Sequence, residues 1–333
     1  SRGNMNSLAS GPSVVLVGAG YWGKNLARNF AKIGELAGIV DGNADQASAV
    51  ANANNCQVVS FHDALSNSAV KGIAIATPAP SHAGIAEHAL KAGKAVFIEK
   101  PICLSQEEGA ILVELSKAAG KPLMIGHLLR YHPHFCHMQE RIQTGGIGKP
   151  RHLLSRRNSL GKVRVEEDVL WSFAPHDISM TLAIADEMPT TVEAQGVSFL
   201  TAGIADCATL QLKFPSGFHA SLEVSWASVR KEQRLVVTGD KGSIIFDDTE
   251  PDWLKKLQLH PVDWDTGGRE PLANRGPVEF IASEESEPLL EECRHFVHCV
   301  HTGAQPITDG AEGLAVLNVL VRAEESLRRN MGL

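Results

Sequence analysis

The stretch Val14-Val15-Leu16-Val17-Gly18-Ala19-Gly20-Tyr21-Trp22-Gly23 decides the fold of this chain. It places a continuous apolar run directly before three glycines in the spacing G-x-G-x-x-G. The first glycine permits a tight turn, the second lets a pyrophosphate approach the backbone, and the third lets a helix pack closely on the strand. A helix that begins here presents its partial positive charge to phosphates. The stretch therefore predicts a dinucleotide site at Gly18, Gly20, Tyr21, Trp22 and Gly23.

An acidic residue follows at the distance that such a site requires. The apolar run Leu36–Val40 ends in Asp41, about 20 positions after Gly18. Its carboxylate can accept hydrogen bonds from a ribose 2′-hydroxyl and would repel a 2′-phosphate. No Arg or Lys follows directly, because residues 42–44 are Gly, Asn and Ala. We therefore expect NAD as the cofactor in place of NADP.

Strand and helix patterns alternate from this stretch up to Gly126. Apolar runs that do not alternate with polar residues predict further strands at 72–76, 95–98 and 123–125. Helices are expected at 24–33, at 81–92, and from a capping box at Ser105 and Glu108 to Gly120. Such runs separated by helices are typical of parallel strands that are covered on both faces. Residues 1–126 are therefore expected to form a doubly wound α/β domain, a Rossmann dinucleotide-binding domain.

The pattern changes after Gly126. Residues 209–213 and 220–224 alternate apolar and polar side chains on either side of a turn, and 234–237 with 243–246 repeat the arrangement. Such hairpins predict an antiparallel sheet that is covered on one face, for which helices near Ser172, at 289–301 and at 311–328 are candidates. Residues 250–285, rich in Pro, Asp, Gly and Glu, are expected to be dominated by loops. Residues 127–333 are therefore expected to be an α+β domain, with the final helix packing back on the first domain.

Composition excludes several classes of protein. The 333 residues suffice for two domains, and the net charge of −7 argues against binding to nucleic acid. No apolar run approaches the ~20 residues that cross a membrane. Ser1–Met5 has no apolar segment of a secretory signal, so Met5 is expected to be the natural start. The six cysteines form no C-x-x-C pair, so we expect reduced thiols and a cytoplasmic location.

Several motifs together carry a resemblance to one family. They are Ala76-Thr77-Pro78 followed by His82, Ile98-Glu99-Lys100-Pro101, Arg130-Tyr131-His132-Pro133 and Pro175-His176-Asp177-Ile178. With the glycine triplet, the chain resembles the glucose-fructose oxidoreductase/inositol dehydrogenase/rhizopine catabolism (Gfo/Idh/MocA) family over nearly its whole length. The resemblance implies a Rossmann domain followed by a substrate domain on a large open, mainly antiparallel sheet. The exposed face of that sheet commonly makes the oligomer interface, which implies a homodimer or homotetramer.

The resemblance also implies the catalytic pair. In this family the lysine of E-K-P and a histidine of the second domain flank the substrate hydroxyl beside the nicotinamide, and the matching residues are Lys100 and His176. A histidine suits removal of the hydroxyl proton at neutral pH, and an ammonium group stabilises the developing negative charge on the oxygen. The family prefers Asp four residues before the histidine, where this chain has Ser172. Its role could pass to Asp177, pass to the upstream carboxylates 166–168, or be dispensable.

Further site residues are expected on the same basis. Contacts with the cofactor are expected from Thr77, Pro78, His82, Glu99 and Lys100. Contacts with the substrate are expected from Lys100, Tyr131, Arg157, Arg164, Trp171, Ser172, His176 and Asp177.

The substrate follows from the finer resemblance. Residues 167–179 and 20–25 are most similar to members associated with surface-polysaccharide and lipid A sugar biosynthesis. Those members oxidise the 3-hydroxyl of a UDP-linked N-acetylhexosamine, or of its uronic acid, for a partner aminotransferase. UDP-N-acetylglucosamine is the expected substrate. Arg156, Arg157 and Arg164 could bind either a uronic acid carboxylate or the diphosphate, so the UDP-linked uronic acid stays an alternative. Two further alternatives for the function stay open. One is a dehydrogenase of a free polyol or monosaccharide, and the other is a cofactor-binding sensor without activity.

The 14 histidines raise the question of a metal site. Two groups carry ligand types that suit zinc: His132, His134, Cys136 and His137, and then Cys293, His295, His298, Cys299 and His301. The second group lies on an expected helix, where positions 293 and 301 fall partly off the face that the other three share. Transfer of a hydride to NAD needs no metal. We therefore expect no metal ion.

Overall fold

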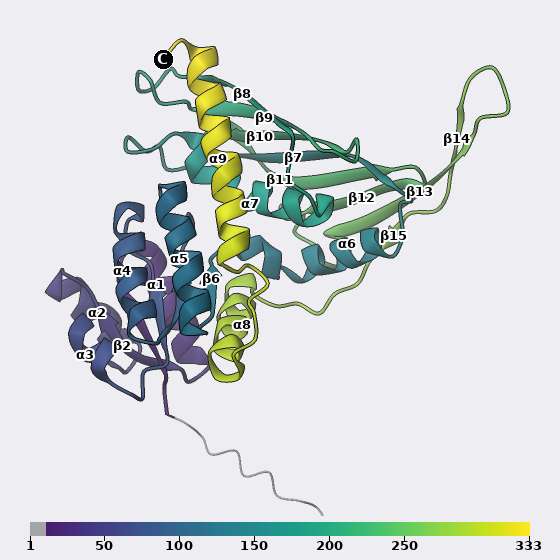
Figure 1. The fold of residues 1–333 in the computed structure, drawn as a ribbon. Coiled ribbons are helices and arrows are strands. Elements are labelled where there is room, and N and C mark those ends of the chain that lie inside the picture. Colours follow the sequence, from purple (N-terminus) through teal and green to yellow (C-terminus); the bar gives the residue numbers. More distant parts are fainter. Residues whose placement is uncertain (1–10) are drawn as a thin grey trace, which may run out of the picture. The chain divides into compact units, whose positions relative to one another are not determined.

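The computed structural model describes residues 11–333, and the expected start at Met5 lies outside the described residues (Figure 1). The chain forms two compact units. The first contains the residues up to Gly126 together with Leu289–Leu314, and the second contains His127–Pro288 together with Ala315–Leu333.

The first unit is built on a parallel sheet of six strands. Their order is β3-β2-β1-β4-β5-β6, and every pair in it is parallel. This order is that of dinucleotide-binding doubly wound folds, so the expected fold class is confirmed. The strands are β1 (Val14–Val17), β2 (Leu36–Val40), β3 (Gln57–Val58), β4 (Gly72–Ile75), β5 (Ala95–Ile98) and β6 (Leu123–Ile125).

The helices of this unit connect its strands. They are α1 (Tyr21–Lys32), α2 (Ala44–Ala53), α3 (Phe61–Ser66), the short 3₁₀ turn η1 (Ala79–Ser81), α4 (His82–Lys91) and α5 (Gln106–Ala119). Helix α1 begins three residues earlier than its apolar pattern suggested, because the glycine loop itself forms the first turn. The Ser105 hydroxyl caps α5 by accepting a hydrogen bond from the Glu108 amide at 3.3 Å, as the capping box predicts. Gly120 ends α5 in the left-handed conformation.

A helix from far along the chain completes the first core. Helix α8 (Pro288–Thr302) is amphipathic, and its Phe296 is fully buried. The Phe296 ring lies 6.2 Å from that of Phe30 on α1 and 5.7 Å from that of Phe97 on β5, measured between centroids. It also contacts Gly72, where an added Cβ would lie 3.1 Å from the ring. Residues near position 296 therefore belong to the first core.

The second unit is built on a mixed sheet of nine strands. Its order is β14-β13-β12-β11-β7-β10-β9-β8, with β15 paired to β13, and only the β7–β10 pair is parallel. Both expected hairpins are present as β9–β10 and β11–β12. The strands are β7 (Pro150–Leu160), β8 (Thr191–Val197), β9 (Cys207–Lys213), β10 (His219–Ser225), β11 (Ala227–Gly239), β12 (Gly242–Asp247), β13 (Leu257–Asp265), β14 (Leu272–Arg275) and β15 (Glu279–Phe280).

Helices cover one face of this sheet. They include α7 (Val169–Ala185), which contacts β7 and β10, α6 (Pro133–Gln143) beside β12, and the later part of α9 (Gly310–Met331). On α9 the Ser326 hydroxyl accepts a hydrogen bond from the Ala194 amide of β8 at 2.9 Å. Two short 3₁₀ turns, η2 (Leu128–Tyr131) and η3 (Trp253–Lys255), complete the unit. Within residues 11–333, no helix combines the length and hydropathy of a membrane span.

The prediction that loops dominate residues 250–285 is wrong. Strands β13, β14 and β15 occupy much of it, and Figure 1 shows the β13–β14 hairpin reaching beyond the rest of its sheet. Leu257 and Leu259 of β13 are buried against β12, whereas the tip of the hairpin is exposed. The Pro, Asp, Gly and Glu residues are concentrated toward that exposed tip, where few side chains are buried. They gave the whole segment the composition of a loop, so the sequence did not predict its strands.

Candidate active site

The glycine loop has the geometry that a dinucleotide needs. Gly18 has φ +101°, and an added Cβ would lie 2.7 Å from the Ala76 carbonyl carbon at the end of β4. An added Cβ at Gly23 would lie 2.0 Å from the Gly18 carbonyl oxygen. Gly20 precedes α1 in extended conformation and has no side chain that would fill the space in front of the helix. The loop is therefore closed by backbone contacts and leaves the amino terminus of α1 open to a pyrophosphate.

Asp41 is fixed at the position expected of a ribose-binding carboxylate. Its Oδ2 accepts a hydrogen bond from the Ala19 amide of the glycine loop at 2.7 Å, and its Oδ1 accepts one from the Asn43 amide at 2.7 Å. The first of these bonds ties the end of β2 to the glycine loop. The glycine cradle and this carboxylate fit NAD, which would lie along Gly18, Gly20 and Asp41.

His82 joins the two loops that follow β4 and β5. Its Nε2 lies 2.7 Å from the Thr77 carbonyl oxygen, and its Nδ1 lies 2.8 Å from the Pro101 carbonyl oxygen. Burial lowers the pKa of His82, although both carbonyl contacts favour the charged form. The side chain is buried, so His82 positions Thr77 and the E-K-P loop and does not offer a ring nitrogen to a cofactor.

The E-K-P motif lies at the carboxyl end of β5. The Glu99 amide donates a hydrogen bond to the Ile75 carbonyl of β4 at 2.9 Å, and the Lys100–Pro101 peptide bond is cis. Parallel strands direct their carboxyl ends to one edge of the sheet, so Gly18, Asp41, Thr77 and Lys100 gather at that edge. Tyr21, in the first turn of α1, is 85% exposed there.

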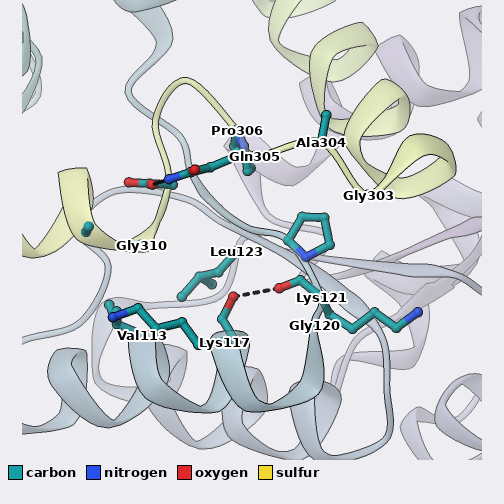
Figure 2. Close-up of a pocket in the computed structure, with 14 residues that line it drawn as sticks. Val113, Lys117, Gly120, Lys121, Leu123, Gly303, Ala304, Gln305, Pro306 and Gly310 are labelled. Atoms are coloured by element: carbon teal, nitrogen blue, oxygen red, sulfur yellow. Dashed lines mark hydrogen bonds between the residues drawn. The ribbon is translucent and has the colours of Figure 1, made fainter.

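The pocket in Figure 2 lies at the opposite edge of this sheet. It has a volume of about 380 Å³ and is lined by the end of α5, the start of β6 and the segment that leads into α9. Lys117, Lys121 and Leu123 are among its lining residues, and they surround the amino end of β6. Ligands of doubly wound folds bind at the carboxyl ends of the strands, so this pocket is separate from the dinucleotide site.

Helix α7 carries the expected catalytic histidine in the second unit. Asp168 begins the helix by accepting a hydrogen bond from the Trp171 amide at 3.2 Å. Ser172 and His176 are one turn apart on a common helix face, and both are partly exposed. Trp171 is largely buried. Lys100 belongs to the first compact unit and His176 to the second.

Asp177 is bound by two neighbouring side chains. Arg157 of β7 donates to it twice, from Nε to Oδ2 at 2.7 Å and from Nη2 to Oδ1 at 3.3 Å. Ser155 donates to Oδ1 at 2.8 Å. Asp177 is only 2% exposed, and these hydrogen bonds from β7 join α7 to the sheet. Its hydrogen bonds oppose the expectation that it replaces the missing family Asp beside His176.

The other expected site residues of the second unit have different surroundings. Tyr131 is buried in η2. Arg164 lies in the loop before α7, with its Nε 3.4 Å from Glu167, and remains partly exposed. Arg156 lies on β7 between Glu223 and Glu232. All three arginines lie beside carboxylates, but Arg164 and Arg156 are 42% and 38% exposed, so both are more accessible to an anionic ligand than Arg157, which is 14% exposed.

The first histidine group is held by hydrogen bonds within the second unit. His132 Nδ1 accepts from the His134 amide at 3.1 Å, so its proton lies on Nε2, which is 3.2 Å from Asp248. His134 Nε2 contacts the Trp253 carbonyl oxygen at 2.9 Å. In the described part of the chain, no three His, Cys, Asp or Glu side chains come together as metal ligands would.

Two family models match the chain. One, an oxidoreductase family with an NAD-binding Rossmann fold, matches residues 13–127, and the other, the Gfo/Idh/MocA C-terminal domain, matches residues 135–245. Among curated proteins, UDP-N-acetylglucosamine 3-dehydrogenase of Acidithiobacillus ferrooxidans is 34% identical over 94% of this chain and 98% of its own length. Inositol 2-dehydrogenase of Rhizobium meliloti is 27% identical over 94% of this chain and 96% of its own. A solved structure of the Acidithiobacillus enzyme superimposes with a TM-score of 0.82 at 27% identity, covering 96% of this chain and 98% of that one.

Proposed function

The chain belongs to the Gfo/Idh/MocA family of NAD-dependent oxidoreductases that act on CH–OH groups of sugars and polyols, and from this we propose that it oxidises the 3-hydroxyl of UDP-N-acetylglucosamine. The observation that carries the choice of substrate is the 34% identity to a UDP-N-acetylglucosamine 3-dehydrogenase over almost the full length of both chains. The products are the UDP-linked 3-keto sugar, NADH and a proton.

When bound, NAD supplies the acceptor for the hydride that leaves C3 of the sugar. In our proposal His176 takes the proton of the 3-hydroxyl, and Lys100 donates a hydrogen bond to the same oxygen. Removal of the proton raises electron density on that oxygen, and the ammonium group stabilises this charge. Gly18, Gly20 and Asp41 hold the dinucleotide, and Ser172 lies one turn before the base on α7.

The choice of a neutral sugar is supported by the pairing of Arg157. A uronic acid needs a cation at its C6 carboxylate, and the charge of Arg157 is already matched by Asp177. We assign the partly exposed Arg164, whose Nε lies 3.4 Å from Glu167, to the diphosphate, to which a guanidinium can donate two hydrogen bonds. The substrate contacts of Tyr131, Trp171 and Ser172, and the cofactor contacts of Tyr21, Trp22, Pro78 and Glu99, belong to the same proposal.

The wider setting is proposed on the same basis. A 3-keto sugar is the substrate form that an aminotransferase needs, so we place such an enzyme next in the reaction sequence, within the cytoplasm. Residues 1–126 serve the cofactor. Residues 127–333, apart from Leu289–Leu314 that fold with the first unit, serve the substrate and a homodimer or homotetramer interface.

A substrate panel tests the proposal. NADH formation is measured with UDP-N-acetylglucosamine, the corresponding UDP-linked uronic acid, myo-inositol and glucose, and the product is trapped at C3 with hydroxylamine for mass spectrometry. We expect turnover and a C3 oxime with UDP-N-acetylglucosamine. Turnover confined to inositol or glucose would overturn the substrate, and would fit the similarity to inositol 2-dehydrogenase. NADH binding without turnover of any compound would favour a sensor.

A further inference from the structure

Asp206 is a buried carboxylate that joins two segments of the second unit. It is 0% exposed and ends the loop between β8 and β9. Its Oδ1 accepts a hydrogen bond from the Trp226 indole Nε1 at 2.7 Å, and its Oδ2 accepts from the Phe199 and Leu200 amides at 2.9 and 3.0 Å. All three donors are uncharged N–H groups. A buried carboxylate is costly unless such donors point at it, so Asp206 fixes where they lie.

The ionisation of this carboxyl agrees with its contacts. Burial raises the pKa of Asp206, but the hydrogen bonds from the two amides and the indole outweigh burial, so the pKa lies below its usual range. The group is therefore ionised at neutral pH and accepts hydrogen bonds with both oxygens. A neutral carboxyl would carry a proton on one oxygen and would lose part of this acceptor capacity.

A backbone hydrogen bond connects this fixed point to the start of α7. Ala205 directly precedes Asp206, and its carbonyl accepts from the Val169 amide at 3.0 Å. Val169 is the first residue of α7. Because an α-helix is a regular rod, the place of its first turn sets the places of Ser172 and His176, about one and two turns further on.

The Trp226 side of the network reaches the loop that carries Arg164. The Trp226 carbonyl accepts from the Gly161 amide at 3.0 Å, and Gly161 begins the loop between β7 and α7. The same glycine lies against α7, since an added Cβ would lie 3.0 Å from the Phe173 ring. Arg164 follows three residues later and is partly exposed. The loop is therefore held at its start by Trp226, whose indole is held by Asp206.

We propose that Asp206 is a positioning residue for the sugar nucleotide, which sets the first turn of the helix that carries His176 and the loop that carries Arg164. Asp206 touches no reacting atom and acts through Trp226 and the backbone of 198–206. Accuracy matters here, because a displacement of about 1 Å can lower a rate by about 10²-fold. The inference rests on the proposed roles of His176 and Arg164, whereas the link from Asp206 to α7 can be measured without substrate.

Hydrogen exchange followed by mass spectrometry tests this link. Asp206→Asn replaces one acceptor oxygen by an NH₂ group, which must face either the indole N–H or the two backbone amides, donor against donor. We expect exchange to quicken by about tenfold in residues 161–172 and 198–206 and to stay unchanged in α8. The matched control Asp263→Asn, on the exposed part of β13, should change neither segment. Unchanged exchange, or quickening confined to 198–206, would overturn the proposal.

A second variant decides the matter if Asp206→Asn does not fold. Trp226→Phe removes the indole donor and leaves the carboxylate with its two amide contacts. Exchange should then quicken in 161–168 and stay unchanged in 198–206. In the double variant the asparagine NH₂ faces a phenyl ring in place of an N–H, so 198–206 should exchange more slowly than in Asp206→Asn alone. Wild-type exchange in 161–168 of Trp226→Phe would contradict the proposed support of the Arg164 loop.

Turnover separates positioning from folding. In Asp206→Asn the kcat for UDP-N-acetylglucosamine should fall by about tenfold or more and its KM should rise by about tenfold. The KM for NAD should stay unchanged, because Gly18 and Asp41 belong to the first unit. A fall in kcat with both KM values unchanged would indicate only a smaller folded fraction and would overturn the positioning role. If the wild-type protein does not turn over UDP-N-acetylglucosamine, the proposed function fails, while the exchange results still decide whether Asp206 holds α7.

Discussion

Arg157 binds the Asp177 carboxylate with two parallel hydrogen bonds, from Nε at 2.7 Å and from Nη2 at 3.3 Å. This pair joins β7 to α7 directly beside His176 in the sequence. The sequence predicts that both side chains contact substrate, and in the structure they also hold the helix that carries the expected base. The position of His176 therefore depends on a buried ion pair.

Breaking this ion pair should destabilise the protein strongly. Arg157→Met or Asp177→Asn should each lower the free energy of unfolding by about 3 kcal/mol, because the remaining group stays buried without its partner. The double variant should lose less than the sum of the two. Urea unfolding measures all three, with Arg156→Met as a control that should cost less than about 1 kcal/mol, since its ion pairs are partly exposed. Additive losses would show that the pair has no mutual stabilisation.

Lys100 and His176 should be needed for turnover more than for folding. Lys100→Met and His176→Asn should each lower kcat by about 10²-fold or more, because a hydrogen-bond donor or a proton acceptor is lost at the reacting hydroxyl. Steady-state NADH formation gives kcat, and circular dichroism checks the fold. The controls are Lys91→Met and His137→Asn, which change partly or largely exposed side chains on α4 and α6. Rates within a few-fold of wild type would exclude the proposed roles.

Asp41 should set the preference for NAD over NADP. Asp41→Asn removes the negative charge but keeps an acceptor for the Ala19 amide, so the glycine loop should keep its shape. We expect NADH affinity to fall by about tenfold and NADPH affinity to rise, because a charged acceptor for the ribose is lost and a 2′-phosphate is no longer repelled. Titration of cofactor fluorescence measures both affinities. Asp45→Asn, on the exposed first turn of α2, should change neither. An unchanged preference in Asp41→Asn would contradict the assignment.

His134 should make the protein less stable in mild acid. Burial and the neighbouring His132 lower the pKa of His134 to about 4 from its usual 6.5. Between these values the unfolded chain binds a proton that the folded protein does not, so the free energy of unfolding falls as pH falls from 6.5 to 4. Urea unfolding at a series of pH values should show that the free energy of unfolding of the wild-type protein falls by about 2 kcal/mol more over this range than that of His134→Gln. The glutamine can still donate a hydrogen bond to the Trp253 carbonyl. Identical pH slopes in the two proteins would exclude His134 as a source.

Asp168 should change the stability of the protein with pH in the opposite direction to His134. Burial raises the pKa of this capping carboxyl to about 6, with Glu324 and Glu167 adding to the effect. The folded protein then holds a proton that the unfolded chain has lost, so stability falls as pH rises from about 4 to 6. Asp168→Asn keeps an acceptor for the Trp171 amide and should gain about 1 kcal/mol at pH 7, with no gain below about pH 4. Thermal unfolding at pH 7 and pH 4 measures this, with Glu166→Gln as the control, because Glu166 is exposed and does not raise the pKa of Asp168. A gain of equal size at both pH values would show that ionisation is not its cause.

Much of the first unit could be predicted because its signals are local. A strand that ends in Gly18, a helix that begins beside it and an acidic residue after the next strand lie within 30 residues, so a linear pattern describes a three-dimensional site. The capping box at Ser105 is equally local. The sequence did not predict strand β3 because it has only two residues. It did not predict β13–β15 because their exposed hairpin has the composition of a loop.

The sequence by itself determined the doubly wound sheet, the glycine cradle, Asp41 and the motifs that carry Lys100 and His176, since each depends on a few neighbouring residues. Only the tertiary structure decided that Arg157 and Asp177 pair with each other, although 20 positions separate them, and that His82 joins two loops. A sequence pattern records which groups are present but not which are desolvated together. For a charged side chain, that shared desolvation decides whether it binds a ligand, holds a helix or keeps a proton.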